Sequence, residues 1–397
     1  MKVPISRIHL TEDELNSVTI PLKKGWLVQG KEVNDFQNKW KKFNSVKYAI
    51  AVNSCTSALQ LALVSIGFKK GDKALVPAFT WVSTANVVEN LGGEVVFSDI
   101  DLETFNLDQR QGLEVINNSI KALIPVHLFG LPCEMAKIVS LSKKYSCRVI
   151  EDAACGLGAE LNGKPVGSFG DIGCFSFHPR KSITTGEGGM LTTNDKLLAQ
   201  KLKMLSDNGA FISESQRLQG AKPYLLADHL ISGYNMRMTD LQGALGSAQM
   251  DRVKEIIEER RQLANIYNHA FEDIEWLRTP TFKTQNKING FQSYPCLFQP
   301  LELRLKNVKR INLLRNEFMD KLNELGVSTR PATHAVHMLS YYREKYKIKP
   351  EDFPNAYIAD QCSVSLPLFH GMSDVEQHHV ITSVKHVFSK MKFSNEV

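Results

Sequence analysis

The stretch that decides the fold of this chain runs Phe175-Ser176-Phe177-His178-Pro179-Arg180-Lys181-Ser182-Ile183-Thr184-Thr185-Gly186-Glu187-Gly188-Gly189. A short apolar segment ends in a lysine, and a turn rich in glycine follows at once. This order lets one amine point from a rigid strand end into a pocket that small residues keep open. A lysine shielded from water loses part of its preference for the charged form and can attack a carbonyl carbon to form a Schiff base. We therefore interpret Lys181 as a candidate catalytic residue; the alternative is a surface lysine beside a turn.

An acidic pair follows another apolar segment, in the run Val149-Ile150-Glu151-Asp152-Ala153-Ala154. In a mostly parallel sheet, the carboxyl ends of the strands line the ligand crevice. A carboxylate at that place can keep the ring nitrogen of pyridoxal phosphate (PLP) protonated, which makes the ring an electron sink. Asp152 suits this role, although the small residues after it would also allow Asp152 to cap a helix.

Three further segments add to this pattern. Small hydroxyl residues in Asn53-Ser54-Cys55-Thr56-Ser57 precede a helical pattern, and a helix start attracts phosphate; an ordinary serine or threonine cap is the alternative. Trp81 can stack on a cofactor ring, although an isolated tryptophan is more often part of a core. The run Gly233-Tyr234-Asn235-Met236-Arg237-Met238 by itself indicates only a loop before a helix.

Together, and in this order, these segments resemble the DegT-type sugar aminotransferases, which have the fold type I architecture of PLP enzymes. The similarity covers nearly the whole chain, from Gly25-Trp26 to Leu366-Pro367-Leu368. The stretch from Ser176 to Gly189 is its most specific part. Relatives that remove a hydroxyl group carry histidine at the lysine position, so Lys181 favours the aminotransferase branch.

The resemblance implies roles for the residues around the cofactor ring. Lys181 would carry PLP as a Schiff base, Asp152 would pair with the ring nitrogen, and Trp81 would stack on the ring. The chain departs from the family three residues after the aspartate, where Cys155 replaces the usual glutamine, histidine or glutamate. Cys155 would lie near the phenolic oxygen of the cofactor, where a thiol is a weak hydrogen-bond donor.

The resemblance also implies contacts with the phosphate of the cofactor and with the substrate. Within one subunit the phosphate would be held by small residues, namely Cys55, Thr56 and Ser176. Asn235 would reach the phosphate of a neighbouring subunit, so a homodimer or higher homo-oligomer with shared active sites is expected. The expected substrate contacts are Arg237 and His334.

We therefore expect a PLP-dependent aminotransferase that moves an amino group from an amino acid to a nucleotide-linked keto-deoxy sugar. By resemblance the donor is L-glutamate, and the product is an amino sugar for lipopolysaccharide, O-antigen or another glycoconjugate. The run Arg330-Pro331, followed by His334 and His337, is similar to the subgroup that aminates carbon 4 of the sugar. Amination at carbon 3 is the first alternative.

Two other functions remain open on the same fold. A cysteine desulfurase would need a reactive cysteine on a mobile loop, and Cys296 and Cys362 are the candidates, although both lie in apolar surroundings that favour buried, inert thiols. A regulatory protein that retains a PLP fold without turnover is the other alternative, against which the intact Lys181, Asp152 and Ser176 count.

Composition limits the partners and the compartment. The 397 residues, 43% of them hydrophobic, are enough for a large core and suggest two domains. A net charge of +6 without a dense basic cluster does not favour nucleic acid as a partner. The seven cysteines are scattered without metal-ligand spacing, which fits reduced thiols in the cytoplasm and no metal site. We see no apolar signal core and no run long enough to span a membrane.

The order of apolar and helical patterns predicts the architecture. Seven strands are expected: Ala49–Val52, Ala74–Pro77, Val95–Asp99, Ala122–Pro125, Arg148–Glu151, Gly173–Phe177 and Gly189–Thr193. Their alternation with helical patterns predicts an α/β fold like that of aspartate aminotransferase, with a mostly parallel central sheet. We expect a large PLP-binding domain over residues 1–250 and a smaller C-terminal α+β domain over residues 251–397. Residues 240–271 read as one long helical stretch.

Residues 158–166 allow two interpretations, a phosphate-binding loop and a β-hairpin. Gly158 to Lys164 has the spacing of a P-loop, but Pro165 stands where the metal-binding hydroxyl should be. Asn162-Gly163 between short apolar flanks instead predicts a hairpin turn.

Overall fold

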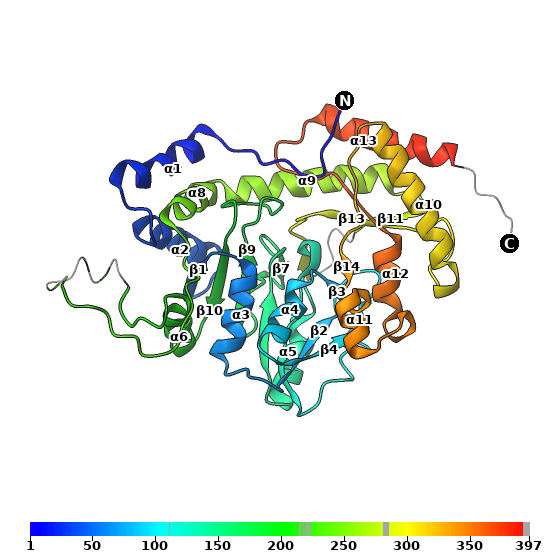
Figure 1. The fold of residues 1–397 in the computed structure, drawn as a ribbon. Helices are drawn as coiled ribbons and strands as arrows, with labels where there is room; N and C mark the ends of the chain where they lie inside the picture. Colours follow the sequence, from blue (N-terminus) through cyan, green and yellow to red (C-terminus); the bar gives the residue numbers. More distant parts are fainter. Residues whose placement is uncertain are drawn as a thin grey trace.

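The computed structural model describes residues 1–110, 112–213, 216, 218, 222, 224–280 and 286–391. A seven-stranded sheet lies at its centre, in the order β1-β10-β9-β6-β5-β2-β4 (Figure 1). Its strands are β1 (Tyr48–Val52), β2 (Lys73–Pro77), β4 (Glu94–Ser98), β5 (Ile120–Leu123), β6 (Arg148–Asp152), β9 (Ile172–Ser176) and β10 (Gly189–Thr193). Within this sheet, β10 is antiparallel to both of its neighbours, β1 and β9, and the other neighbouring pairs of strands are parallel. The predicted α/β fold with a mostly parallel sheet is confirmed.

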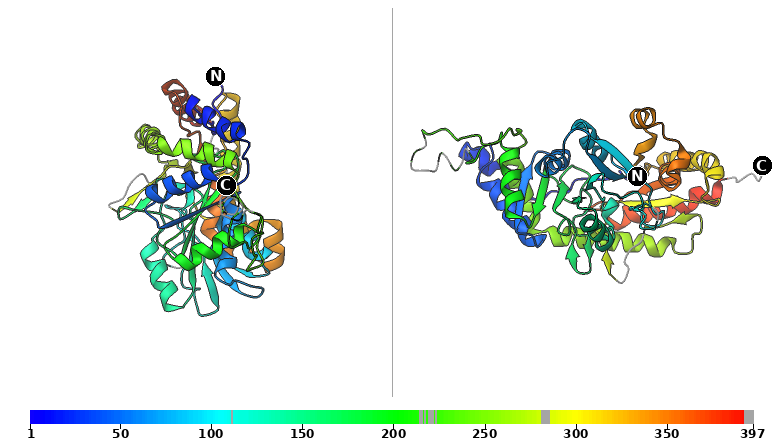
Figure 2. Two further views of the ribbon diagram at one scale, coloured as in Figure 1. Left: turned by 90° about the vertical axis from the view of Figure 1, so that its left-hand side faces the viewer. Right: turned by 90° about the horizontal axis from the view of Figure 1, so that it is seen from below.

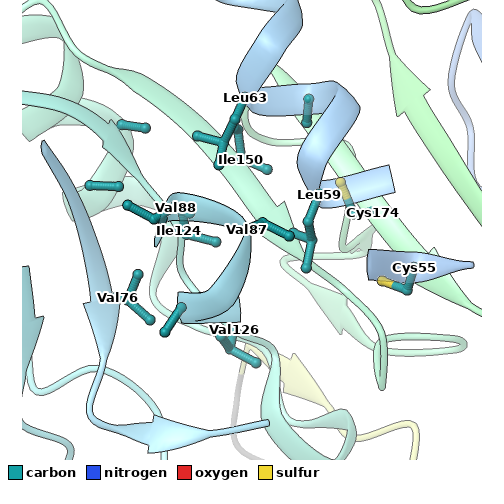
Figure 3. Packing of buried hydrophobic residues seen from close by; sticks show 14 of the residues in the cluster. Cys55, Leu59, Leu63, Val76, Val87, Val88, Ile124, Val126, Ile150 and Cys174 are labelled. Carbon is teal, nitrogen blue, oxygen red and sulfur yellow. The ribbon is translucent and has the colours of Figure 1, made fainter. Parts of the chain in front are cut away.

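Helices cover both faces of this sheet because its strands are apolar on both sides. In β1, Ile50 and Val52 belong to the core under α3 (Cys55–Ser65), α4 (Ser83–Asn90) and α6 (Lys196–Ser206). Ala49 and Ala51, one residue out of phase, belong to the core on the other face. The helices on that face are α2 (Lys31–Phe43), α5 (Met135–Lys144), α8 (Asp240–Asp251) and the start of α9 (Val253–Phe271). Figure 3 shows Leu59 and Leu63 of α3 packed beside Ile150.

A second, smaller sheet has the order β11-β13-β15 and is antiparallel. It is built from β11 (Leu277–Arg278), β13 (Tyr294–Phe298) and β15 (Ser363–Leu366). The helices beside it are α10 (Leu305–Glu324), α12 (Pro354–Cys362) and α13 (Asp374–Lys390). These elements share a separate core with the end of α9 and with Val3, which pairs with Val327. The proposed domain boundary near residue 250 remains a prediction.

The helical stretch expected over residues 240–271 is two helices, α8 and α9, separated at Arg252. Arg252 leaves the helical conformation at φ −116° and ψ 16°, and its side chain forms an ion pair with Glu14 and a hydrogen bond with His370. Neither glycine nor proline lies at this break, so no residue type marks it in the sequence. Figures 1 and 2 show α9 running between the end of the molecule with α1 (Glu12–Lys24) and α2 and the end with α10 and α13.

Short elements complete the fold. The strands β7 (Glu160–Leu161) and β8 (Lys164–Pro165) form the predicted hairpin, with positive φ at Asn162 and Gly163, and β12 (Lys287–Ile288) extends it. The strand β3 (Phe79–Thr80) pairs with β14 (His334–Ala335). Over the described ranges, the remaining short helices are η1 (Leu128–Gly130), η2 (Val336–Met338), α11 (Ser340–Tyr346) and η3 (Pro350–Asp352). Among the described helices, none has the length and apolar character that a membrane span requires.

Candidate active site

A pocket of about 320 Å³ opens where the central strands end. Seven of the predicted site residues line it: Cys55, Thr56, Trp81, Asp152, Cys155, Ser176 and Lys181. They lie at or after the ends of β1, β3, β6 and β9, and three of these strands belong to the central sheet. The carboxyl edge of such a sheet is the usual place for a ligand crevice, so segments distant in the sequence meet at one site.

Lys181 lies in the turn after β9, five residues beyond the last strand residue, Ser176. Its backbone N–H donates to the carbonyl of His178 at 2.8 Å, and its Nζ donates to Cys155 Sγ at 3.1 Å. The loop that follows is fixed to α8, because the Gln249 side chain bonds both the N–H and the carbonyl of Thr184. The amine of Lys181 therefore extends into the pocket from a backbone that hydrogen bonds hold on both sides.

Asp152 ends β6 as a buried carboxylate with two neutral partners. Its Oδ2 accepts from Thr84 Oγ1 at 2.8 Å and its Oδ1 from the Ala154 N–H at 3.1 Å. Burial raises the pKa of Asp152, while these two hydrogen bonds and the charges of Lys181 and His127 oppose the shift. No helix begins after Asp152, so the capping alternative is excluded.

The surroundings of Asp152 can be tested against the cofactor. Among the described residues, no cation hydrogen-bonds to this buried carboxylate. A buried charge is stable only with a compensating partner, and the protonated pyridine nitrogen of PLP is such a partner. Asp152 and Lys181 thus fit the two ends of one ring, its nitrogen and its aldehyde carbon.

The helix α3 offers a phosphate site at its first turn. Ser54 caps the helix by accepting from the Ser57 N–H at 3.1 Å, and the first amides of a helix lack acceptors within it. The thiol of Cys55 packs in the core, so Cys55 can serve a phosphate only through its backbone amide (Figure 3). Gly189 allows β10 to approach this helix start, because a Cβ there would lie 2.5 Å from the Ser54 carbonyl oxygen.

Trp81 stands at the rim of the pocket with 53% of its surface exposed, which excludes the core alternative. The ring of His334 lies 5.8 Å from the ring of Trp81, because β14 pairs with β3 and sets His334 opposite Thr80. An exposed indole beside a pocket is available for stacking on a planar ring. His334 therefore lies next to the pocket without lining it.

Asn235 and Arg237 lie outside the set of described residues that line this pocket. Asn235 is exposed and forms a backbone bridge with Asp207, whose carboxylate accepts from Arg237 at 2.5 Å. Both expected roles remain predictions: for Asn235 a contact with the phosphate of a neighbouring subunit, and for Arg237 a contact with the substrate.

Three residues of the site were missed by reasoning from the sequence. Thr84 lies in the run around Trp81, but only tertiary structure reveals its bond to Asp152. Arg180 and Arg330 both line the pocket. Both had a signal in the sequence: Arg180 directly precedes Lys181, and Arg330 opens the Arg330-Pro331 run that was interpreted only as a mark of the sugar subgroup.

Comparisons with known proteins identify the family of this chain. The model of the DegT/DnrJ/EryC1/StrS aminotransferase family matches residues 9–385. The spore coat polysaccharide biosynthesis protein SpsC of Bacillus subtilis is 35% identical over 387 residues, 97% of each chain. The GDP-perosamine synthase of Escherichia coli O157:H7 is 32% identical over 391 residues, 98% of this chain and 99% of that protein.

A solved structure gives the same fold. The protein Spr1654 from Streptococcus pneumoniae, in its PLP form, superposes with a TM-score of 0.88 at 24% identity, covering 98% of this chain and 99% of that one. The fold is therefore fold type I, and the cofactor is PLP. The chain belongs to the DegT/DnrJ/EryC1/StrS aminotransferase family and is a PLP-dependent aminotransferase.

Proposed function

We propose that the enzyme transfers an amino group from L-glutamate to carbon 4 of a nucleotide-linked keto-deoxy sugar. The amino sugar would enter a surface polysaccharide or glycoconjugate such as lipopolysaccharide O-antigen. The observation that carries the amino transfer is the placement of Lys181 and the buried Asp152 in one pocket. The similarity to a GDP-perosamine synthase and to SpsC supports a sugar substrate of this class.

The predicted site residues of the pocket divide the proposed reaction among them. When bound, PLP supplies an aldehyde that exchanges amines and a ring that accepts the electron pair of the substrate carbon. Lys181 would hold the cofactor through its aldehyde carbon, and its amine would serve as the base and acid that moves a proton at the substrate carbon. Asp152 would keep the ring nitrogen protonated, and Trp81 would stack on the ring. The first turn of α3 and Ser176 would hold the phosphate.

The desulfurase alternative finds little support in the buried cysteines. Cys296 and Cys362 are both fully buried, on β13 and at the end of α12. Burial raises the pKa of the Cys296 thiol, and it raises that of Cys362 to about 12. A thiol in this state supplies almost no thiolate, the form that attacks.

A panel of UDP-, GDP- and dTDP-linked keto-sugars, each incubated with enzyme, PLP and L-glutamate, tests the proposal. Mass spectrometry identifies conversion, and NMR of the product locates the new amine. The proposal expects a 4-amino sugar together with 2-oxoglutarate. A 3-amino product would establish the first alternative, and alanine formation from cysteine without sugar conversion would establish the desulfurase.

A further inference from the structure

Two arginines at the Lys181 pocket carry charge that no carboxylate neutralises. Arg180 directly precedes Lys181, and Arg330 lies shortly before β14; both line the pocket. Within the described part of the chain, neither forms a salt bridge. The guanidinium of Arg330 donates only to the carbonyl of Ala332, at 3.2 Å. These are the positive groups that the proposed chemistry has not used.

The two guanidinium groups act on each other. Arg330 is half-buried, and burial lowers its pKa; the charge of Arg180 lowers this pKa further. Like charges held together cost free energy unless an anion lies between them. The carboxylates lining the same pocket are Asp152, assigned to the ring nitrogen, and Glu187, which is exposed and forms no bond with either arginine. The pocket therefore lacks an anion beside Arg330.

The backbone around Arg330 is held in place. Its carbonyl accepts from the Ser365 N–H of β15 at 2.8 Å, and Pro331 follows directly. Gln292 fixes the neighbouring backbone of Arg180 by donating to its carbonyl at 2.7 Å. A guanidinium on a fixed backbone suits a planar oxyanion, which it can bind through two parallel hydrogen bonds.

Resting on the proposed function, we infer that Arg330, assisted by Arg180, binds the α-carboxylate of the amino-acid donor. The geometry that favours this ligand is the closeness of the site to the reacting amine. Cys155 lies 3.1 Å from Lys181 Nζ, and Cys155, Lys181 and Arg330 all line the same pocket. The α-carboxylate is joined to the same carbon as the reacting nitrogen, so it must lie beside Lys181.

The diphosphate of the nucleotide-linked sugar, the other anion of the reaction, fits the site beside Arg330 less well. In a nucleotide-linked 4-keto sugar, the diphosphate is attached at carbon 1, across the ring from the carbon that receives the amine. With carbon 4 at Lys181, the diphosphate would lie a sugar ring farther away than an α-carboxylate. Oxyanion chemistry is common to both ligands, so the experiment must separate them.

The first arm measures the donor half-reaction. Holoenzyme is mixed with L-glutamate, and the loss of visible absorbance at increasing glutamate gives its apparent Kd. Arg330→Gln should raise this Kd about 10- to 100-fold, the size expected for a lost charged hydrogen-bond pair. Arg330→Lys should give an intermediate rise in the Kd, since lysine keeps the positive charge but cannot form the two parallel hydrogen bonds of a guanidinium group. Arg180→Gln should have a smaller effect because Arg180 is exposed.

Arg343→Gln is the matched control. Arg343 is an exposed arginine on α11 outside the pocket lining, so its loss changes the net charge equally and should leave the glutamate Kd within about twofold. An Arg330→Gln protein that also stays within about twofold of the wild type would overturn the inference.

The second arm uses ligands that do not react. Calorimetric titration of the holoenzyme with glutarate and, separately, with UDP, GDP and dTDP measures anion binding without turnover. Arg330→Gln should weaken glutarate binding and leave nucleoside diphosphate binding unchanged. Weakened diphosphate binding with unchanged glutarate binding would assign Arg330 to the sugar nucleotide and refute the inference. A wild-type enzyme that converts no keto-sugar but shows Arg330-dependent glutarate binding would refute the proposed function alone.

Discussion

At the scale of single residues, one hydroxyl group orients the carboxylate at the centre of the site. Thr84 is fully buried, and its Oγ1 lies 2.8 Å from Asp152 Oδ2 and 3.1 Å from the carbonyl oxygen of Trp81. It thus connects the carboxylate proposed for the ring nitrogen to the turn that carries the indole proposed to stack on the ring. Thr84 is a positioning residue, because it acts through Asp152.

Replacing Thr84 by valine should lower kcat about 10- to 100-fold while the protein remains folded, because valine keeps the shape and removes the hydrogen bond. Thr84→Ser restores the hydroxyl and should recover most of the activity. The visible absorbance of the bound cofactor should also change its pH dependence in Thr84→Val, which a purely structural role would not cause. Unchanged kcat and unchanged pH dependence would contradict this role.

The sequence identified the residues whose local pattern is distinctive. Lys181 is marked by the glycines after it and Asp152 by the apolar run before it, and both line the pocket. Thr84 carries no such mark, because its importance arises only from its hydrogen bond to Asp152, which is distant in the sequence. Family resemblance supplied the expected roles of Asn235 and Arg237, which remain predictions.

At the scale of elements, a buried carboxylate next to Asp152 fixes a loop to the central sheet. Glu151 of β6 accepts from the N–H groups of Gly167, Phe169 and Gly170, each at 2.7 Å, and lies 2.9 Å from His127 Nε2. Burial opposes the charge of Glu151, but these hydrogen bonds outweigh it and lower the pKa of Glu151. One side chain thus holds the loop between β8 and β9.

Glu151→Gln should lower the free energy of unfolding by about 3 kcal/mol at pH 7, because it removes one partner of a buried charged network. The folded-state pKa of Glu151 is lowered, so its contribution is complete above its unfolded pKa of about 4.3 and is lost as pH falls through the folded value. Urea unfolding at several pH values between 3 and 7 measures this. A variant that loses stability on acidification as steeply as the wild type would contradict the assignment.

Among the elements, the seven central strands were predictable from their apolar runs, but their directions were not. The strand β10 runs antiparallel because the loop with Lys181 returns the chain directly beside β9. The pairing of β3 with β14 joins Thr80 to His334 across the sequence and has no local signal. The break at Arg252 likewise coincides with contacts to Glu14 and His370, which are distant in the sequence.

At the scale of the whole molecule, the helix α9 joins two hydrophobic cores. Ile256 and Ile257 pack beside the central sheet, whereas Tyr267 and Phe271 pack beside the smaller sheet. The pocket draws on both parts, because Arg330 precedes β14 while Lys181 follows β9. This arrangement supports the proposed two-domain organisation with the active site between the parts.

The assembly should be at least a dimer with shared active sites, since Asn235 is exposed away from the Lys181 pocket of its own chain. Mixing inactive Lys181→Ala protein with an inactive Asn235 variant should restore partial activity, because one hybrid site would then be intact. The test requires an Asn235 change that abolishes activity alone and subunits that exchange. A monomer by light scattering at the assay concentration would contradict the prediction.

The central claim is that Lys181 carries the cofactor. Purified enzyme should absorb visible light as a lysine-bound PLP protein, and borohydride reduction followed by peptide mapping should place the pyridoxyl group on Lys181. Lys181→Ala should show neither the label at this position nor turnover, whereas Lys164→Ala, outside the pocket lining, should retain both. A pyridoxyl group found on a different lysine, or a Lys181→Ala protein that still turns over, would contradict the account.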